Sequence, residues 1–245
     1  MAEGLVIVTG GSRGIGAAAA RRLAGDGYAA AVVFTSQPDP AHDVVRQIQA
    51  AGGAAAAFRA DVSVESEVDG MFAAAQERFG PVVGLVNSAG IIGAQTRFEA
   101  YPLEAMRHLL EVNVVGTMLP CRAAVRAMST KRGGRGGAIV NLSSAAARLG
   151  GAGEIVPYAA TKGAIDSFTI GLGREVAEEG IRVNAVAPGM IATEMNSAER
   201  LGRLVPAVPM KRAGTADEVA EAIAWLISPA ASYLCGSIVT VSGGR

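Results

Sequence analysis

Short apolar runs alternate with longer amphipathic stretches along almost the whole chain, and this alternation most constrains the fold. Strands buried on both faces are continuous apolar segments, and parallel neighbours need a helical crossover between them. The pattern therefore predicts repeated βαβ units that build a doubly wound, seven-stranded parallel sheet with helices on both faces. The expected strands are residues 5–9, 29–34, 54–60, 82–87, 138–143, 182–187 and 237–242.

The amphipathic stretches carry helix start and stop signals. Residues 15–27, 65–80 and 158–180 each end on a glycine, which can adopt the left-handed backbone found just after many helices. Hydroxyl side chains that can cap a helix N-terminus also stand before two stretches. The closing glycines are Gly27, Gly80 and Gly180, and the expected N-caps are Ser63 and Thr215, with Glu218 completing a capping box around Thr215.

The size and charge of the chain favour one well-packed domain that acts on a small molecule. Half of the 245 residues are apolar and 18% are charged, so a large core can be buried in a single domain spanning residues 1–245. Lysine plus arginine and aspartate plus glutamate balance at 22 each, which argues against nucleic-acid binding. No stretch is typical of a signal peptide or a membrane-spanning helix, so we expect a cytoplasmic protein without a membrane partner.

The cysteines and histidines lack the spacing of metal ligands. Cys121 and Cys235 are far apart, and His42 and His108 have no partners nearby. We therefore expect no metal site.

Residues 189–214 form the longest expected irregular region. They follow a Pro-Gly turn and contain Pro206 and Pro209. Long excursions in compact folds are commonly lids or binding loops, so this segment is the expected cover of a substrate pocket.

The sequence VTGGSRGIG puts a glycine-rich turn directly after the first expected strand and at the start of a helix. Glycine allows a tight turn and the close approach of a pyrophosphate, whose charge then meets free backbone N–H groups. Close packing of strand and helix is the alternative reason for the glycines, but the position inside a βαβ unit favours dinucleotide binding. The turn residues expected at the dinucleotide are Gly10, Ser12, Arg13, Gly14, Ile15 and Gly16.

The stretch PYAATK sets Tyr158 four residues before Lys162. Residues four apart share one face of a helix, so the ammonium can lie beside the phenol and stabilise its deprotonated form. Such pairs also occur on ordinary helix surfaces, but this chain has nineteen arginines and only three lysines. A lysine at this position therefore favours a proton-transfer pair.

Seven short motifs occur in an order typical of one enzyme family. They are TGGSRGIG (9–16), DV (61–62), NSAG (87–90), VNVVG (112–116), NLSS (141–144), YAATK (158–162) and VNAVAPGMIAT (183–193). With them the chain resembles, over essentially its whole length, the classical short-chain dehydrogenase/reductase family. The resemblance implies a Rossmann-type fold and an oxidoreductase that transfers hydride between a nicotinamide cofactor and a carbonyl or secondary alcohol.

Within this family the chain is similar to 3-oxoacyl-carrier-protein reductases and to glucose dehydrogenase-like members. We expect an NADPH-dependent ketoreductase that acts on a small carbonyl compound. An NAD(P)-dependent sugar or alcohol dehydrogenase is the alternative within the family. A non-catalytic NADP(H)-binding sensor or scaffold is the alternative of another class, although all four catalytic positions of the family are present.

The resemblance assigns a role to each of these four residues. Tyr158 exchanges a proton with the substrate oxygen, and Ser144 orients that oxygen. Lys162 lowers the pKa of Tyr158 and binds the ribose, while Asn113 supports a water that links the lysine to solvent. Ser144 lies fourteen residues before Tyr158 instead of the commoner thirteen, so the loop 145–157 contains one extra residue that alters the pocket wall.

The same resemblance assigns further residues to the cofactor. Asp61 contacts the adenine through its side chain and Val62 through its backbone. Residues after the fourth expected strand lie along the adenosine ribose, and residues after the sixth flank the nicotinamide carboxamide. The first group is Asn87, Ala89 and Gly90, and the second is Pro188, Gly189, Ile191 and Thr193.

The end of the second expected strand indicates which nicotinamide cofactor binds. An acidic residue there would bind both ribose hydroxyls of NAD and repel the 2′-phosphate of NADP. The sequence has Thr35 and Ser36 in this region, and Arg13 in the nearby turn can pair with a phosphate. We therefore expect NADP(H), with Asp39 folding back as the alternative source of an acid.

Two kinds of macromolecular partner are open. A basic group of Lys131, Arg132, Arg135 and Arg174 could meet an acidic acyl carrier protein, or its members are solvated surface charges. The family resemblance also implies a homo-oligomer, a homotetramer or a dimer, built through the long helices and the C-terminal segment.

Overall fold

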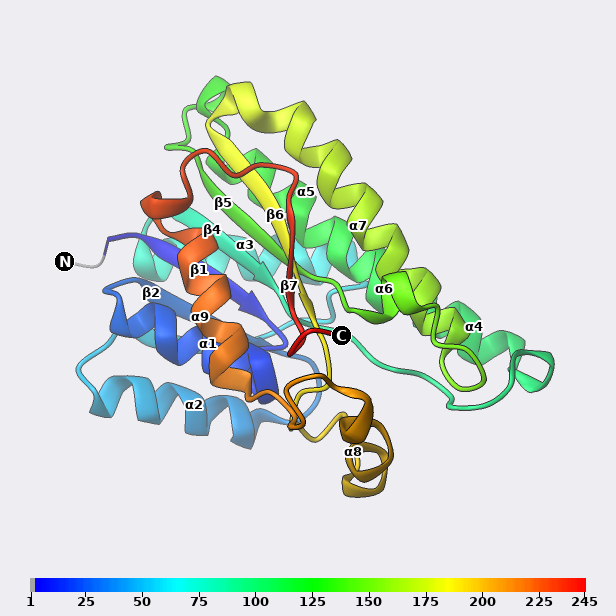
Figure 1. The fold of residues 1–245 in the computed structure, drawn as a ribbon. Coiled ribbons are helices and arrows are strands. Elements are labelled where there is room, and N and C mark those ends of the chain that lie inside the picture. Colours follow the sequence, from blue (N-terminus) through cyan, green and yellow to red (C-terminus); the bar gives the residue numbers. More distant parts are fainter. Residues whose placement is uncertain (1–2) are drawn as a thin grey trace.

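A computed structural model describes residues 3–245, and the seven strands of this part form one parallel sheet (Figure 1). The strands are β1 (Leu5–Thr9), β2 (Ala29–Phe34), β3 (Ala55–Arg59), β4 (Val82–Asn87), β5 (Gly137–Leu142), β6 (Ile181–Pro188) and β7 (Ile238–Val241). Their order is β3-β2-β1-β4-β5-β6-β7, so the chain winds outward from β1 in one direction and from β4 in the other. This order confirms the predicted doubly wound, Rossmann-type sheet. Ligands of such sheets bind where the winding reverses, outside the carboxyl ends of the strands.

Helices cover both faces of the sheet and close two apolar layers (Figure 1). In β1 the side chains alternate, because Val6 and Val8 pack into one layer and Leu5 and Ile7 into the other. The first layer is closed by α1 (Gly14–Gly25), α2 (Pro38–Ala50) and α9 (Ala216–Ile227). The second layer is closed by α3 (Glu65–Phe79), α5 (Gly116–Met128) and α7 (Val156–Val176).

The remaining helical segments are short. Between α4 (Leu103–Leu110) and α5 the helix makes one π turn, Glu111–Val115. The other short helices are α6 (Ala146–Leu149) and α8 (Ala198–Leu204). Turns of 3₁₀ helix are Phe98–Ala100, Thr130–Arg132, Ala177–Glu179, Val205–Ala207 and Pro229–Ala231.

The predicted strands all exist; β1, β2 and β4 have the predicted ends, and the ends of the other four differ by one residue. The capping box of Thr215 and Glu218 at the start of α9 is confirmed. The prediction of Ser63 as the N-cap of α3 is wrong, since Val64 occupies that position. Ser63 instead donates its hydroxyl to Asp61 Oδ1 at 2.6 Å, so its oxygen serves the turn before the helix.

The segment 189–214 is less irregular than expected. It contains α8, which begins after Ser197, and the Ser197 side chain accepts a hydrogen bond from the backbone N–H of Arg200. This cap supplies a partner for a helix-end N–H that the helix itself leaves free. The segment predicted to cover the pocket therefore contains a short capped helix, whose backbone sets where its side chains start.

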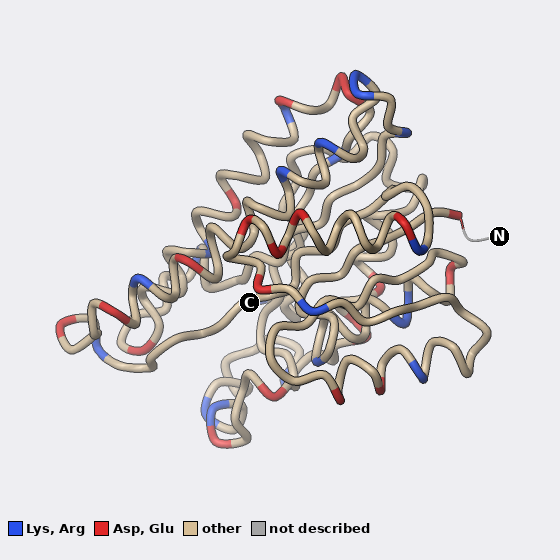
Figure 2. Tube along the Cα trace, turned by 180° about the vertical axis from the view of Figure 1, so that it is seen from behind, with Lys and Arg blue, Asp and Glu red and all other residues tan. Residues whose placement is uncertain are grey.

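Charged residues are concentrated on the outer helices and loops (Figure 2). Within the seven strands the charged residues are Arg59 and Arg182. Arg182 lies near the start of β6, and its guanidinium donates four hydrogen bonds, at 2.8 to 3.1 Å, to backbone carbonyls at and just after the end of α9. The last carbonyls of a helix lack partners within the helix and attract positive charge, so Arg182 holds the end of α9 against the sheet. These carbonyls belong to Leu226, Ile227, Ser228 and Ala231.

Replacing Arg182 by alanine should lower the free energy of unfolding by about 3 kcal/mol, because the carbonyls at the end of α9 lose charged partners in a half-buried place. Urea denaturation followed by circular dichroism measures the change. Arg46→Ala is the matched control, since Arg46 pairs with Asp43 on the exposed face of α2 and its loss should change stability by less than about 0.5 kcal/mol. Equal stability of the two variants would contradict the anchoring role of Arg182.

Candidate active site

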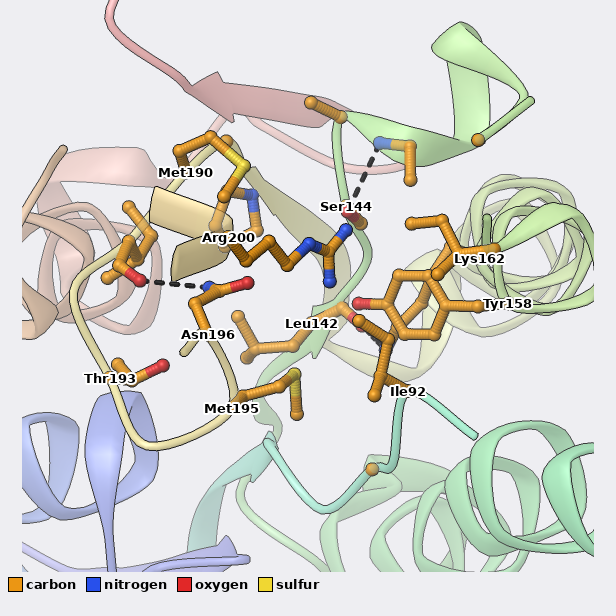
Figure 3. Close-up of a pocket in the computed structure, with 18 of the residues that line it drawn as sticks. Ile92, Leu142, Ser144, Tyr158, Lys162, Met190, Thr193, Met195, Asn196 and Arg200 are labelled. Atoms are coloured by element: carbon orange, nitrogen blue, oxygen red, sulfur yellow. Dashed lines mark hydrogen bonds between the residues drawn. The ribbon is translucent and has the colours of Figure 1, made fainter. Parts of the chain in front are cut away.

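A cavity of about 970 Å³ lies at the carboxyl ends of the central strands (Figure 3). It is bounded by the turns after β1, β4, β5 and β6, by the start of α7 and by the segment that carries α8. Thirteen of the residues expected at the site line this cavity. They are Gly10, Arg13, Gly14, Ile15, Ala89, Gly90, Ser144, Tyr158, Lys162, Pro188, Gly189, Ile191 and Thr193.

The other expected residues do not line the cavity. Thr35 and Ser36 lie at the end of β2, and the Asp61 carboxylate accepts hydrogen bonds from Ser63, which hold the pKa of Asp61 below its ordinary value. Their contacts with a cofactor stay predictions. The residues outside the lining are Ser12, Gly16, Thr35, Ser36, Asp61, Val62, Asn87 and Asn113.

The glycine turn after β1 leaves no room for side chains. Gly10 and Gly14 have positive φ angles of 62° and 49°, which favour glycine. A Cβ atom on Gly10 would lie 2.8 Å from the backbone of Ala89, and one on Gly16 would overlap the carbonyl oxygen of Gly10. The turn therefore brings bare backbone and the N-terminus of α1 to the cavity, which fits the diphosphate of a dinucleotide.

Beneath this turn a chain of buried polar groups joins the central strands. Asn87 Nδ2 donates to Asn141 Oδ1 at 2.9 Å, and Asn141 Nδ2 donates to Thr169 Oγ1 at 3.0 Å. The Thr9 hydroxyl accepts from the backbone N–H groups of Ser88 and Ala89 at 3.2 and 3.3 Å. The side chain of Asn87 thus turns into the protein, and its place along the ribose stays a prediction.

Asn113 lies on the π turn and is fully buried. Its amide exchanges two hydrogen bonds of 2.9 Å with the backbone of Ile91 and donates to the Thr161 hydroxyl at 3.1 Å. A Cβ atom on Gly90 would lie 3.3 Å from Asn113 Oδ1 and 3.7 Å from Lys162 Nζ. Asn113 therefore fixes the loop after β4 beside the lysine and the α7 helix.

Tyr158 and Ser144 present their hydroxyls to the same end of the cavity (Figure 3). Burial raises the pKa of the Tyr158 phenol, whereas the Ser144 hydroxyl and the charge of Arg200 act in the opposite direction. The Ser144 oxygen accepts a hydrogen bond from the backbone N–H of Ala146 at 3.1 Å, which leaves its proton free to be donated elsewhere.

Lys162 is buried and carries few polar contacts. Its Nζ donates to the carbonyl oxygen of Leu142 at 2.6 Å and lies 5.7 Å from the centre of the Tyr158 ring. Burial lowers the pKa of Lys162 to about 8, against the opposing charge of Asp166. The groups that lower the pKa of the phenol in this structure are Ser144 and Arg200, and the effect of Lys162 on the phenol stays a prediction.

The sequence did not point to Arg200 and Glu154. Arg200 comes from α8, and its guanidinium reaches toward Tyr158 and Ser144 (Figure 3). Glu154 comes from the loop 145–157, and its Oε1 lies 3.6 Å from Arg200 Nε and 2.9 Å from Arg203 Nη2. The Ser197 cap and the charged residues after it were the available signal for a helix in this segment.

Among residues 3–245, no three His, Cys, Asp or Glu side chains gather as metal ligands, and no described helix is long and apolar enough to cross a membrane. Burial raises the pKa of the Cys121 thiol to about 12, which favours the protonated thiol at neutral pH. Of the expected basic group, Lys131 lies 3.9 Å from both Glu178 and Glu179.

Comparisons with known proteins agree with this geometry. A family model described as enoyl-(acyl carrier protein) reductase matches residues 10–245. The chain is 48% identical to an uncharacterized oxidoreductase of Escherichia coli, covering 98% of this chain and 99% of that protein. It is 36% identical to a 3-oxoacyl-[acyl-carrier-protein] reductase of Synechocystis, covering 98% and 96% of the two chains. The crystal structure of a short chain dehydrogenase from Burkholderia cenocepacia in complex with NADP is similar, with a TM-score of 0.90, 35% identity and coverage of 98% and 96%.

Lys162→Met should remove a pH-dependent part of the stability. Burial lowers the pKa of Lys162 from 10.5 to about 8, so between these values the unfolded chain holds the proton and the folded chain releases it. The free energy of unfolding of the wild type therefore rises with pH in this window, and below it the buried charge lowers stability by about 3 kcal/mol.

Urea denaturation between about pH 7 and pH 10 tests this sign. The stability advantage of Lys162→Met over the wild type should be largest at the lowest pH and should shrink as the pH rises. Lys131→Met, which removes an exposed lysine, is the comparison variant. If the difference in the free energy of unfolding between Lys162→Met and the wild type stays constant with pH, burial does not lower the pKa of Lys162.

Proposed function

Because the chain belongs to the short-chain dehydrogenase/reductase family, we propose that it is an NADPH-dependent reductase of small carbonyl compounds, able to run as an alcohol dehydrogenase in reverse. One observation carries the proposal: the side chains of Ser144, Tyr158 and Lys162 line the same cavity as the glycine turn of residues 10–16. A scaffold or sensor would need only the turn. The proton donors Ser144, Tyr158 and Lys162 beside the turn favour a catalytic function over a binding function alone.

The bound nicotinamide would supply the hydride that reaches the carbonyl carbon. Gly10, Gly14 and the first backbone N–H groups of α1 would hold the diphosphate, since the cradle that they form has no side chains in the way. Pro188, Gly189, Ile191 and Thr193 after β6 would flank the nicotinamide end. Lys162 would bind the ribose hydroxyls.

Tyr158 would donate the proton that the developing alkoxide needs. The burial that raises its pKa keeps the phenol protonated at neutral pH, which suits a proton donor in the direction of reduction. The Ser144 hydroxyl would donate a second hydrogen bond to the same oxygen and stabilise its growing charge. Lys162, whose pKa is about 8, can hold a proton near neutral pH and would restore it to Tyr158 along the path that Asn113 supports.

A preference for NADPH over NADH is the finer part of the proposal. No acidic side chain lies among Phe34, Thr35 and Ser36, where one would repel the 2′-phosphate. The Arg13 guanidinium donates to Gln37 Oε1, which directs it over this strand end. Arg13 would therefore meet the 2′-phosphate.

A carrier-bound 3-oxoacyl chain is the second candidate substrate, because one relative is a 3-oxoacyl-[acyl-carrier-protein] reductase. The pairing of Lys131 with Glu178 and Glu179 reduces the positive charge of the expected docking group, so a small free substrate is favoured. A sugar or alcohol dehydrogenase is the alternative with the same machinery.

We further propose a single cytoplasmic domain, covered over the site by residues 189–214 and assembled as a homotetramer or dimer.

Tyr158→Phe should lower kcat about 1,000-fold, because the phenyl ring keeps the packing but has no proton to donate. The absorbance loss of NADPH measures the rate with a panel of ketoesters, diketones, quinones and sugars. Tyr233→Phe, which changes a fully exposed tyrosine, is the control and should retain wild-type activity. Full activity of Tyr158→Phe would refute the assigned mechanism.

Arg13→Gln should weaken NADPH binding about 30-fold and change NADH binding little, because only NADPH offers a phosphate to the guanidinium. Fluorescence titration with both cofactors measures the two constants. Arg21→Gln, on the exposed side of α1, should leave both unchanged. Tighter binding of NADH than of NADPH by the wild type would reverse the proposed preference.

A further inference from the structure

Arg200 is a buried charge with unused hydrogen-bond donors inside the cavity. Its residue is 7% exposed, although arginine is almost never buried without a partner. Among residues 3–245, its Nε and Nη1 atoms have no hydrogen-bond partner. Figure 3 shows the guanidinium aimed at the end of the cavity where Tyr158 and Ser144 meet.

The nearest carboxylate does not satisfy Arg200. Glu154 Oε1 lies 3.6 Å from Arg200 Nε, beyond hydrogen-bond distance, while it accepts a hydrogen bond of 2.9 Å from Arg203 Nη2. Two guanidinium groups thus share one carboxylate, and its hydrogen bond goes to Arg203 and not to Arg200. A buried charge without good partners destabilises a fold, and its retention points to a ligand that completes it.

We propose that Arg200 binds a carboxylate of the substrate, which makes the substrate a short oxo acid with its carboxylate one or two carbons from the carbonyl. The inference rests on the proposed function, since Tyr158 and Ser144 would hold the carbonyl oxygen beside this guanidinium. A guanidinium pairs with a carboxylate through two parallel hydrogen bonds, which fixes the orientation of the acid. Ile92, Leu142 and Met195 bound the space nearby and suit a short apolar chain.

The reaction leaves the carboxylate unchanged. The carbonyl carbon gains the hydride and the carbonyl oxygen gains the proton of Tyr158, so the oxo acid becomes a hydroxy acid while NADPH becomes NADP⁺. Arg200 takes no part in bond making, and its role is the selection and orientation of an anionic substrate.

Paired substrates test this role. The rates with 2-oxobutanoate and acetoacetate are compared with those of their methyl esters, which lack the charge. The wild type should prefer at least one acid over its ester by about 10-fold or more in kcat/KM, and Arg200→Gln should lose this preference. Arg200→Lys should keep part of it. Arg46→Gln, which removes an exposed guanidinium on α2, is the control and should keep all of it.

A binding measurement tests independently of turnover whether Arg200 binds a carboxylate. Calorimetric titration with malonate, an unreactive dicarboxylate, should show binding to the wild type that weakens about 10-fold or more in Arg200→Gln, while uncharged malonamide binds neither. The melting temperature of Arg200→Gln should equal or exceed that of the wild type, since an unpaired buried charge is removed.

Equal wild-type rates on acids and esters, or equal malonate affinity of wild type and Arg200→Gln, would overturn the inference while leaving the reductase activity in place. A lower melting temperature of Arg200→Gln with equal losses on acid and ester would assign Arg200 a structural role and overturn it as well. Absence of turnover with every carbonyl would instead refute the proposed function, and the malonate titration would still decide whether Arg200 binds a carboxylate.

Discussion

The hydrogen-bonded chain from Thr9 through Asn87 and Asn141 to Thr169 is the constraint on which the site depends. Thr9 pairs in register with Asn87, and Asn87 with Asn141, so the side chains of three neighbouring strands meet at one level of the sheet. Buried polar groups need partners, and a one-residue slip of any strand would leave several of them without one. The same chain holds the backbone after β4 through Thr9, and this backbone borders both the glycine turn and the lysine. The sheet register therefore sets the distance between the two halves of the cavity.

The polar groups that line the cavity differ from this network, because some of them lack hydrogen-bond partners within the described part of the chain. Beneath the cavity every amide of Asn87, Asn113 and Asn141 has a hydrogen-bond partner. Inside it, Lys162 and Arg200 are buried cations with poor compensation, and burial opposes the charge of the lysine. These two buried cations lower the stability of the free protein and gain partners when a ligand binds. The hydrogen-bonded asparagines below the cavity stabilise the fold around them.

The features that depend on local sequence pattern could be predicted, whereas the directions of individual side chains could not. The strands follow from apolar runs, and the turn of Gly10 and Gly14 follows from backbone demands that only glycine meets. The direction of the Asn87 side chain does not follow from its position, because a residue at a strand end can face either way and its partner Asn141 lies 54 positions along the chain. The burial of Arg200 could not be predicted, because it depends on how α8 packs over the cavity, which no spacing in the sequence encodes.

The π turn at Glu111–Val115 lets one long helix serve two different neighbours. A π turn holds one more residue than an α turn, so it shifts the rotational phase of the helix by about 100°. Before the turn, Leu109 of α4 packs with Tyr101, Ile155 and Tyr158 in a small cluster beside the reacting phenol. After it, Cys121, Ala124 and Met128 of α5 pack into the layer under the sheet. An unbroken α-helix would present a single apolar stripe, so the extra residue allows the helix that supports the sheet to support the tyrosine as well.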